Sequence, residues 1–284
     1  MAATILDGER LAGQLKAELT VRVASLAAAG KRVGLGTILV GDDVPSARYV
    51  ALKHEDCAEV GIESHHAHLP ADVPQRDVLE AVRAFNEDPA VDAFLVQFPL
   101  PGDLDEEEVL FAVDPDKDVD GLHPINLGRL MLGTPVVLPC TPSGIVELLA
   151  AHAVPVDGRH VVVIGRGLTI GRPLSVLLSL KRPGCNAAVT VVHSGVDDLD
   201  EIVRTGDVVV AAAGRAGLVT PAMIKPGAAV VGAGTTWEGR RVLSDVVEEV
   251  ADVAGWVTPR LGGVGPMTRA MLLANAVTAA ERHR

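Results

Sequence analysis

Tyr49 and Lys53 are the residues whose types and spacing point most directly to chemistry in this 284-residue chain. They are four positions apart in a stretch that predicts a helix over residues 46–60, with Ser46 as its cap and Gly61 as its stop. Both side chains would therefore lie on one face, one turn apart. A lysine that is partly removed from water has a lowered pKa and can act as a general base, with the phenol orienting it. The same spacing also fits a surface lysine beside a half-buried tyrosine. Spacing alone leaves both interpretations open.

Two further polar residues in the first half are candidates for binding. Gln97 ends a predicted strand over residues 91–97, and open parallel sheets bind ligands at the carboxyl ends of their strands. Its amide would hydrogen-bond a lysine or a substrate, or would simply cap the strand. Asp120 belongs to the segment 116–121, which copies the start of a calcium loop but lacks the bidentate glutamate at the twelfth position. We therefore predict no calcium, and either a plain turn or a carboxylate that accepts hydrogen bonds from a heterocycle.

The histidines and cysteines give no sign of a metal site. His66 and His68 share one face of a predicted surface strand, without a third ligand nearby in the sequence. Cys57, Cys140 and Cys185 are far apart and show no C-x-x-C spacing. We expect no metal and no disulfide framework, and we interpret the cysteines as small apolar fillers.

A glycine-rich turn is the main feature of the second half. Gly165, Gly167 and Gly171 follow the β-branched run 161–164, which predicts a strand buried on both faces. Glycines let the backbone approach a ligand closely, and the amide groups of a following helix would face a dinucleotide pyrophosphate. The spacing is one residue longer than the usual fingerprint, and plain connectors also contain such turns. The strands and helices predicted after it favour the nucleotide site.

The end of the next predicted strand bears on the choice between NAD and NADP. This strand ends in His193 and Ser194, without the acidic residue that would bind a ribose 2′-hydroxyl. Arg166 in the glycine-rich turn and the hydroxyl of Ser194 both suit a 2′-phosphate. We therefore favour NADP over NAD, the alternative being that Arg166 is a solvated loop residue.

The alternation of predicted strands and helices indicates an α/β protein with two α/β domains. The second domain would be a Rossmann-like parallel sheet, with a cleft between the two. We assign residues 1–139 to a catalytic domain, 140–266 to a nucleotide-binding domain, and 267–284 to a helix that returns to the first domain. The predicted strands cover residues 33–40, 63–69, 91–97, 161–164, 189–194, 207–212 and 228–231.

Composition excludes some partners. Hydrophobic residues make up 48% of the chain but aromatic residues only 2%, so the cores must consist mainly of Ala, Val and Leu. A net charge of −12 argues against nucleic acid and anionic membrane surfaces as partners. No signal-peptide pattern and no apolar run of membrane-spanning length occurs, so we expect a cytoplasmic protein.

Four separated motifs together resemble the bifunctional methylenetetrahydrofolate dehydrogenase/cyclohydrolase (FolD) family. They are SARYVALK at residues 46–53, VQFPLP at 96–101, KDVDG at 117–121 and GGVGPMT at 262–268. The glycine-rich turn and PCTP at 139–142 fit the same pattern, so the likeness spans nearly the whole chain.

This resemblance implies an enzyme of one-carbon metabolism. Such an enzyme oxidises 5,10-methylenetetrahydrofolate with NADP to the methenyl form and hydrolyses that to 10-formyltetrahydrofolate. By motif, Lys53 would be the catalytic lysine, Tyr49 and Gln97 would position the substrate, and Asp120 would hold the pterin. Family members are usually homodimers.

The resemblance also assigns binding residues in the second half. Arg166 and Ser194 would contact the NADP phosphate. The full set of cofactor-binding residues is Gly165, Arg166, Gly167, Gly171, His193 and Ser194. Gly263 and Pro266 would join the substrate-binding residues.

Four positions depart from the family pattern. Gly167 stands where the family commonly has serine, Gly232 where it often has aspartate, Ser244 where it has glycine, and Leu261 where it tends to have proline. All four lie in or beside the cofactor half, so they affect cofactor affinity and the preference for NADP more than the lysine site. The alternatives are another two-domain NAD(P)-dependent dehydrogenase, or a catalytically silent nucleotide-binding protein.

Overall fold

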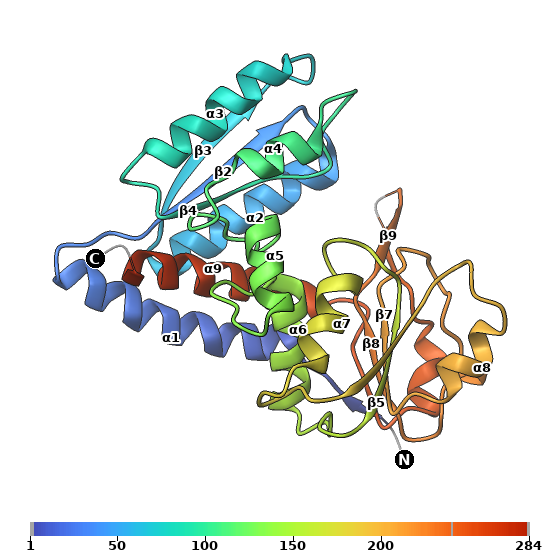
Figure 1. The fold of residues 1–284 in the computed structure, drawn as a ribbon. Coiled ribbons are helices and arrows are strands. Elements are labelled where there is room, and N and C mark those ends of the chain that lie inside the picture. Colours follow the sequence, from blue (N-terminus) through green and yellow to red (C-terminus); the bar gives the residue numbers. More distant parts are fainter. Residues whose placement is uncertain (1–2, 240, 283–284) are drawn as a thin grey trace. The chain divides into compact units, whose positions relative to one another are not determined.

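A computed structural model describes residues 3–239 and 241–282 of the chain (Figure 1). The chain divides into two compact units. The three-stranded unit contains residues 13–140 and 269–282, and the six-stranded unit contains residues 3–12 and 141–268. In the described part of the chain, no helix is both long enough and apolar enough to cross a lipid bilayer.

The three-stranded unit is built on a parallel sheet with the strand order β3-β2-β4. Its strands are β2 (Gly34–Val40), β3 (Glu63–Leu69) and β4 (Ala93–Val96). All of β2 is buried, because it is the central strand and is covered on both faces. Since successive side chains of a strand point to opposite faces, Leu35 and Leu95 belong to one hydrophobic core, and Ile38 and Phe94 to another.

Helices cover both faces of this sheet, so the unit has three layers (Figure 1). Apolar residues of α1 (Gly8–Ala28), α2 (Val44–Val60) and α9 (Val264–Arg282) pack in the core that contains Leu35. The opposite core contains residues of α3 (Gln75–Glu87) and α4 (Glu106–Ala112). A further short helix, α5 (Pro124–Met131), follows the loop after α4.

The six-stranded unit is a Rossmann-like parallel sheet, as the sequence predicts, with the order β1-β11-β8-β7-β5-β6. Its strands are β1 (Thr4–Ile5), β5 (His160–Ile164), β6 (Ala188–Val192), β7 (Val208–Ala211), β8 (Ala229–Gly232) and β11 (Trp256–Val257). The intervening helices are α6 (Cys140–Ala151), α7 (Gly171–Ser179), α8 (Leu199–Arg204), η1 (Pro221–Met223) and η2 (Glu248–Asp252). An antiparallel hairpin of β9 (Thr235–Glu238) and β10 (Arg241–Ser244) extends from this unit.

The first residues of the chain differ from the predicted domain boundary. Strand β1 pairs in parallel with β11, with the N–H of Thr4 donating to Gly255 O at 2.8 Å and that of Leu6 to Val257 O at 2.9 Å. Residues 3–12 therefore belong to the six-stranded unit, whereas the sequence assigned them to the first domain. A two-residue strand has no recognisable pattern of its own, so only long-range pairing reveals it.

The start of α2 also differs from the prediction. The sequence favoured Ser46 as the residue that caps this helix, but the cap is Asp43. Its carboxylate accepts hydrogen bonds from the N–H of Ser46 at 3.0 Å and from the Ser46 hydroxyl at 2.7 Å. An aspartate just before a helix with proline in its first turn is an effective cap, because it satisfies free N–H groups. The predicted end of the helix is confirmed, since Gly61 adopts the left-handed conformation there.

Candidate active site

Lys53 lies in the middle of α2 and is buried, with 9% of its surface exposed. Its Nζ atom donates a hydrogen bond to Oε1 of Gln97 at 3.1 Å. The interpretation of Lys53 as a surface lysine is therefore wrong. Tyr49, one turn earlier in α2, keeps 38% of its surface exposed. The helix thus buries an amine while its phenol stays accessible.

Gln97 follows directly after β4, at the carboxyl end of that strand. Its Nε2 atom donates to the carbonyl of Phe98 at 2.8 Å, which turns Oε1 toward Lys53. Of the roles that the sequence left open for Gln97, the hydrogen bond with the lysine is present in the structure. An uncharged acceptor in this place holds the amine without favouring its protonated form as strongly as a carboxylate would.

The electrostatics of Lys53 and Asp120 are coupled. Burial lowers the pKa of Lys53, and the charge of Asp120 opposes this shift. Burial also raises the pKa of Asp120, against the effect of Lys53. The Cys140 thiol hydrogen-bonds to the Asp120 carboxylate, and burial raises the pKa of that thiol well above its ordinary value. An amine with a lowered pKa beside a carboxyl group is better suited to exchange protons than an ordinary surface lysine.

The loop that carries Asp120 is shaped by a different carboxylate, that of Asp118. Asp118 is buried and accepts hydrogen bonds from the N–H groups of Gly121 at 3.1 Å and His123 at 2.8 Å, and from Nδ2 of Asn126 at 2.9 Å. Gly121 has φ +72°, and a Cβ atom there would lie 2.7 Å from the carbonyl carbon of Leu138. Asp118 therefore folds the loop. The sequence shows the acids at alternate positions, but it does not show that Asp118 folds the loop while Asp120 interacts with Lys53.

Asn275, in α9, holds the same loop from a distant part of the chain. Its Nδ2 atom donates to the carbonyl oxygens of Val119 at 2.9 Å and of Leu138 at 3.0 Å. Val119 immediately precedes Asp120. Sequence reasoning missed Asn275, because it is separated from Val119 by 156 positions and belongs to no local motif.

In the six-stranded unit, the glycine-rich turn joins β5 to α7. Gly165 has φ +118°, and a Cβ atom there would lie 2.2 Å from Ala212 O. A Cβ atom at Gly171 would lie 2.2 Å from Gly165 O. These two glycines are therefore required by close backbone packing. Gly167 has no other heavy atom near its Cβ position, and Arg166 and Gly167 are both exposed.

The turn leads into the amino end of α7, where the helix dipole favours an anion. Strand β6 lies beside β5 in parallel, with Ile164 opposite Val192. Arg166 and Ser194 each follow two positions after one of these paired residues, so they lie at the same edge of the sheet. Ser194 is exposed and His193 is half-buried. The sequence-predicted cofactor residues of the two strand ends thus lie on neighbouring strands.

Asp245 shapes the neighbouring loop after β7 and was not assigned a role from the sequence. It is fully buried, and its carboxylate accepts hydrogen bonds from the N–H groups of Ala213 at 2.7 Å, Gly214 at 3.0 Å and Arg215 at 2.7 Å. Because these N–H groups are occupied by Asp245, they are not available to a phosphate.

Gly263 and Pro266, which the sequence assigned to substrate binding, are buried in the six-stranded unit. Gly263 precedes α9, and its carbonyl packs so closely on Gly8 that a Cβ atom on Gly8 would lie 1.9 Å from it. Pro266 lies in the first turn of α9. The structure thus groups Lys53, Gln97 and Asp120 in one unit. Gly263, Pro266 and the residues of the glycine-rich turn belong to the other.

The four departures from the family pattern have distinct surroundings. Gly167 is in open space, and Leu261 is 60% exposed. Gly232 and Ser244 lie against each other, because a Cβ atom at Gly232 would be 2.7 Å from the Ser244 hydroxyl oxygen. The serine hydroxyl therefore occupies space that a larger residue at position 232 would need.

Comparison with known families gives two matches that cover most of the chain. A family model described as the tetrahydrofolate dehydrogenase/cyclohydrolase catalytic domain matches residues 6–120. A second, described as the NAD(P)-binding domain of tetrahydrofolate dehydrogenase/cyclohydrolase, matches residues 139–284.

Individual relatives agree with these matches. The chain is 55% identical over 281 residues to the Bifunctional protein FolD of Syntrophotalea carbinolica, covering 99% of this chain and 97% of the relative. It is similar to the crystal structure of the bifunctional enzyme FolD from Campylobacter jejuni, with a TM-score of 0.95, 39% identity and complete coverage of both chains. It is also similar to the Trypanosoma brucei FolD structure complexed with NADP cofactor and inhibitor, with a TM-score of 0.94, 40% identity, and coverage of 100% of this chain and 99% of that one.

Proposed function

The chain belongs to the tetrahydrofolate dehydrogenase/cyclohydrolase family, and from that premise we propose that it is a bifunctional enzyme of one-carbon metabolism. It oxidises 5,10-methylenetetrahydrofolate to the 5,10-methenyl form with NADP and hydrolyses the product to 10-formyltetrahydrofolate. The observation that carries the proposal is the buried Lys53, hydrogen-bonded to Gln97 and electrostatically coupled to Asp120.

The oxidation needs orientation more than proton transfer. The hydride leaves a carbon between two nitrogens, so the resulting cation is delocalised and no base is required. NADP, when bound, supplies the hydride acceptor. The contribution of the chain is to bind and align the reactants, which by itself can lower a barrier substantially.

The hydrolysis requires a base, and Lys53 is suited to that role. Water adds to the methenyl carbon and releases a proton, which the neutral amine of Lys53 accepts. The ammonium then returns a proton to the ring nitrogen as its bond to that carbon breaks, and the hydroxyl proton of the adduct passes to solvent as the formyl group forms. Gln97 orients the amine, and Asp120 accepts hydrogen bonds from N–H groups of the pterin. We assign Tyr49, Gly263 and Pro266 to substrate binding on the basis of their motifs.

The cofactor would be bound by the turn between β5 and α7. Gly165, Gly167 and Gly171 let the pyrophosphate approach the amino end of α7. Arg166, Ser194 and His193 would contact the 2′-phosphate, a preference supported by the missing acid at the end of β6. Arginine matches the geometry of phosphate oxygens better than lysine does.

We further propose that the protein is a cytoplasmic homodimer. In the described part of the three-stranded sheet, β4 is an outer strand, and its residue Phe94 forms a β-bridge with Asp118. The outer strand on the opposite edge is β3. An edge strand of this kind can pair with a second copy of the chain. Sedimentation of the purified protein tests the dimer, and a monomer at micromolar concentration would contradict it.

The cytoplasmic location is supported by the cysteines. Cys57, Cys140 and Cys185 are free thiols, which fits a reducing compartment.

Two absorbance assays test the enzymatic proposal. The first follows reduction of NADP or NAD in the presence of 5,10-methylenetetrahydrofolate, and the second follows loss of the methenyl chromophore without any cofactor. We expect both reactions to occur and NADP to be preferred. Reduction of NAD alone would contradict the cofactor assignment. Binding of the folate with no turnover in either assay would favour a silent nucleotide-binding protein.

A further inference from the structure

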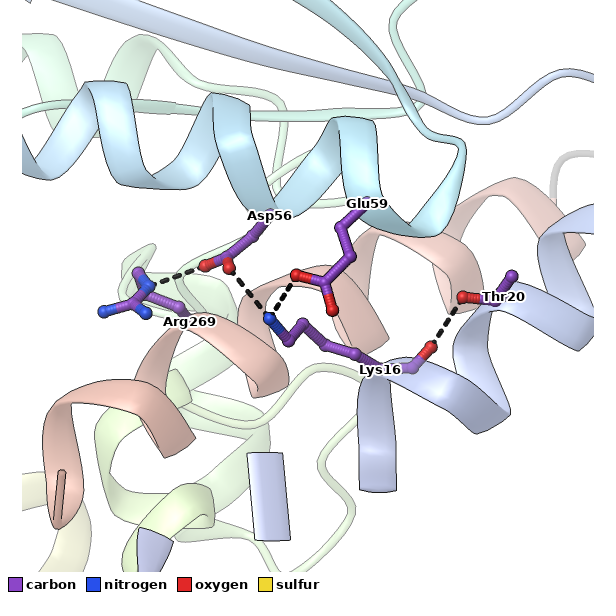
Figure 2. Close-up of polar contacts among 5 residues, drawn as sticks. All are labelled: Lys16, Thr20, Asp56, Glu59 and Arg269. Atoms are coloured by element: carbon purple, nitrogen blue, oxygen red, sulfur yellow. Dashed lines mark hydrogen bonds and ion pairs between the residues drawn. The ribbon is translucent and has the colours of Figure 1, made fainter. Parts of the chain in front are cut away.

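Asp56 lies between two cations from distant parts of the chain (Figure 2). The Nζ atom of Lys16 in α1 is 3.2 Å from Asp56 Oδ1, and Nε of Arg269 in α9 is 2.6 Å from Asp56 Oδ2. The side chain of Asp56 is 10% exposed, and those of Lys16 and Arg269 are 15% and 18% exposed. Three helices are thus joined through one nearly buried carboxylate.

The charges of this cluster are balanced. Lys16 also pairs with Glu59, one turn further along α2. Burial lowers the pKa of Lys16, but the hydrogen bonds to Glu59 and Asp56 outweigh that effect, so its pKa is raised overall and the ammonium stays charged. Two cations face two carboxylates, so the cluster adds little net charge near Lys53. The cluster therefore acts on Lys53 mainly by fixing its position, and much less through its charge.

Asp56 is three residues after Lys53 on α2, so the two side chains leave the helix roughly 60° apart around its axis. Holding Asp56 against α9 therefore fixes the rotation of α2 about that axis. At the outer radius of a helix, roughly 6 Å from the axis, a rotation of roughly 10° moves a group by about 1 Å. Such a shift would break the 3.1 Å hydrogen bond between Lys53 and Gln97.

Helix α9 also holds the loop that carries Asp120. Asn275 is six residues after Arg269 in α9, about 9 Å further along the axis. It donates hydrogen bonds to the carbonyl oxygens of Val119 and Leu138, on either side of the Asp120 segment. One rigid helix thus contacts both the element that carries the amine and the loop that carries the carboxylate.

We propose that Asp56, Arg269 and Asn275 are positioning residues for the hydrolysis, with α9 as the common reference that holds Lys53 against Asp120. The inference depends on the function proposed above. Loosening the Asp56 attachment moves the base, and loosening the Asn275 attachment moves the Asp120 loop, so either change slows the hydrolysis. The oxidation needs no base, so it changes much less.

The test compares both activities in Arg269→Gln and Asp56→Asn. We expect kcat for methenyltetrahydrofolate hydrolysis to fall about 10- to 100-fold, the loss typical of a misplacement of about 1 Å, with a much smaller change in KM. The rate of NADP reduction should change much less, by no more than about threefold, because that step uses no general base. Arg269→Lys should recover part of the loss. Asn275→Ser detaches the Asp120 loop instead of α2. It should also lower the rate of hydrolysis relative to the rate of oxidation.

Arg22→Gln is the matched control, because Arg22 pairs with Glu281 at 2.8 Å and hydrogen-bonds to Thr278, so it also joins α1 to α9. It should leave both activities unchanged. Equal losses in the two activities of the Asp56 and Arg269 variants, or no loss of hydrolysis, would overturn the inference. Absence of hydrolysis in the unmodified protein would instead overturn the proposed function itself. Melting temperatures identify a variant that fails to fold, and the remaining variants then decide the question.

Discussion

The Nζ atom of Lys53 donates a hydrogen bond of 3.1 Å to Oε1 of Gln97, so a buried amine on a helix is held by an amide at the end of a strand. The amide of Gln97 is oriented by its second hydrogen bond, to Phe98 O. The amine is thereby fixed by an uncharged acceptor while burial lowers its pKa. A lysine in these surroundings can be neutral and correctly placed at the same time, as a general base requires.

Lys53→Met should separate the two proposed activities. The methionine keeps most of the side-chain volume but cannot accept a proton, so hydrolysis of the methenyl compound should fall by about 10²- to 10⁴-fold. Reduction of NADP should persist, because hydride transfer needs no base. Stopped-flow or steady-state absorbance measures both rates. Lys181→Met, at an exposed position, is the control. An unchanged rate of hydrolysis in Lys53→Met would remove this lysine from the mechanism.

Asp120→Asn should shift the pH dependence of hydrolysis toward acid. The neutral amine is the active form, so the rate rises as pH increases through the pKa of Lys53. Burial lowers that pKa and the Asp120 carboxylate raises it, so removal of the carboxylate lowers it further. The acid limb of kcat, measured at saturating substrate, should therefore move to lower pH. Movement to higher pH would show that Lys53 does not sense Asp120.

Gly165→Ala should destabilise the protein and Gly167→Ser should not, although both alter the same turn. A Cβ atom at Gly165 would lie 2.2 Å from a backbone oxygen, and its φ of +118° strains any other residue. We expect a loss of stability of at least about 1–3 kcal/mol and weaker NADP binding. Gly167→Ser meets no neighbour, so its stability should change by less than about 0.5 kcal/mol. Thermal denaturation and NADP titration measure these effects, and equal sensitivity at the two sites would contradict the packing argument.

Gly232→Ala and Ser244→Gly should be coupled. The new Cβ atom would lie 2.7 Å from the Ser244 hydroxyl oxygen, so Gly232→Ala alone should be destabilising. Ser244→Gly removes that oxygen, so the double variant should be more stable than the sum of the single changes predicts, by about 0.5–3 kcal/mol. Denaturant unfolding of the four proteins in the cycle gives this value. Additive effects would show that the two positions are independent.

Sequence patterns alone predicted the elements that have local causes. The β-branched run before Gly165 predicted β5, and the left-handed glycine at position 61 predicted the end of α2. These features follow from short-range sterics and hydrophobic periodicity, which act within a few residues. The same reasoning missed β1, because two residues carry too little pattern, and it placed the cap of α2 on Ser46 instead of Asp43.

For the candidate site, the sequence determined the residue types and their spacing: an amine one turn from a phenol, an amide at a strand end, and a glycine turn before a helix. Tertiary structure decided that Lys53 is buried, that Gln97 is its partner from 44 positions away, and that Asp118 folds the loop. It also brought Asn275 to that loop from α9. The physical reason is that desolvation and hydrogen-bond geometry depend on atoms contributed by distant segments, and no local pattern specifies those atoms.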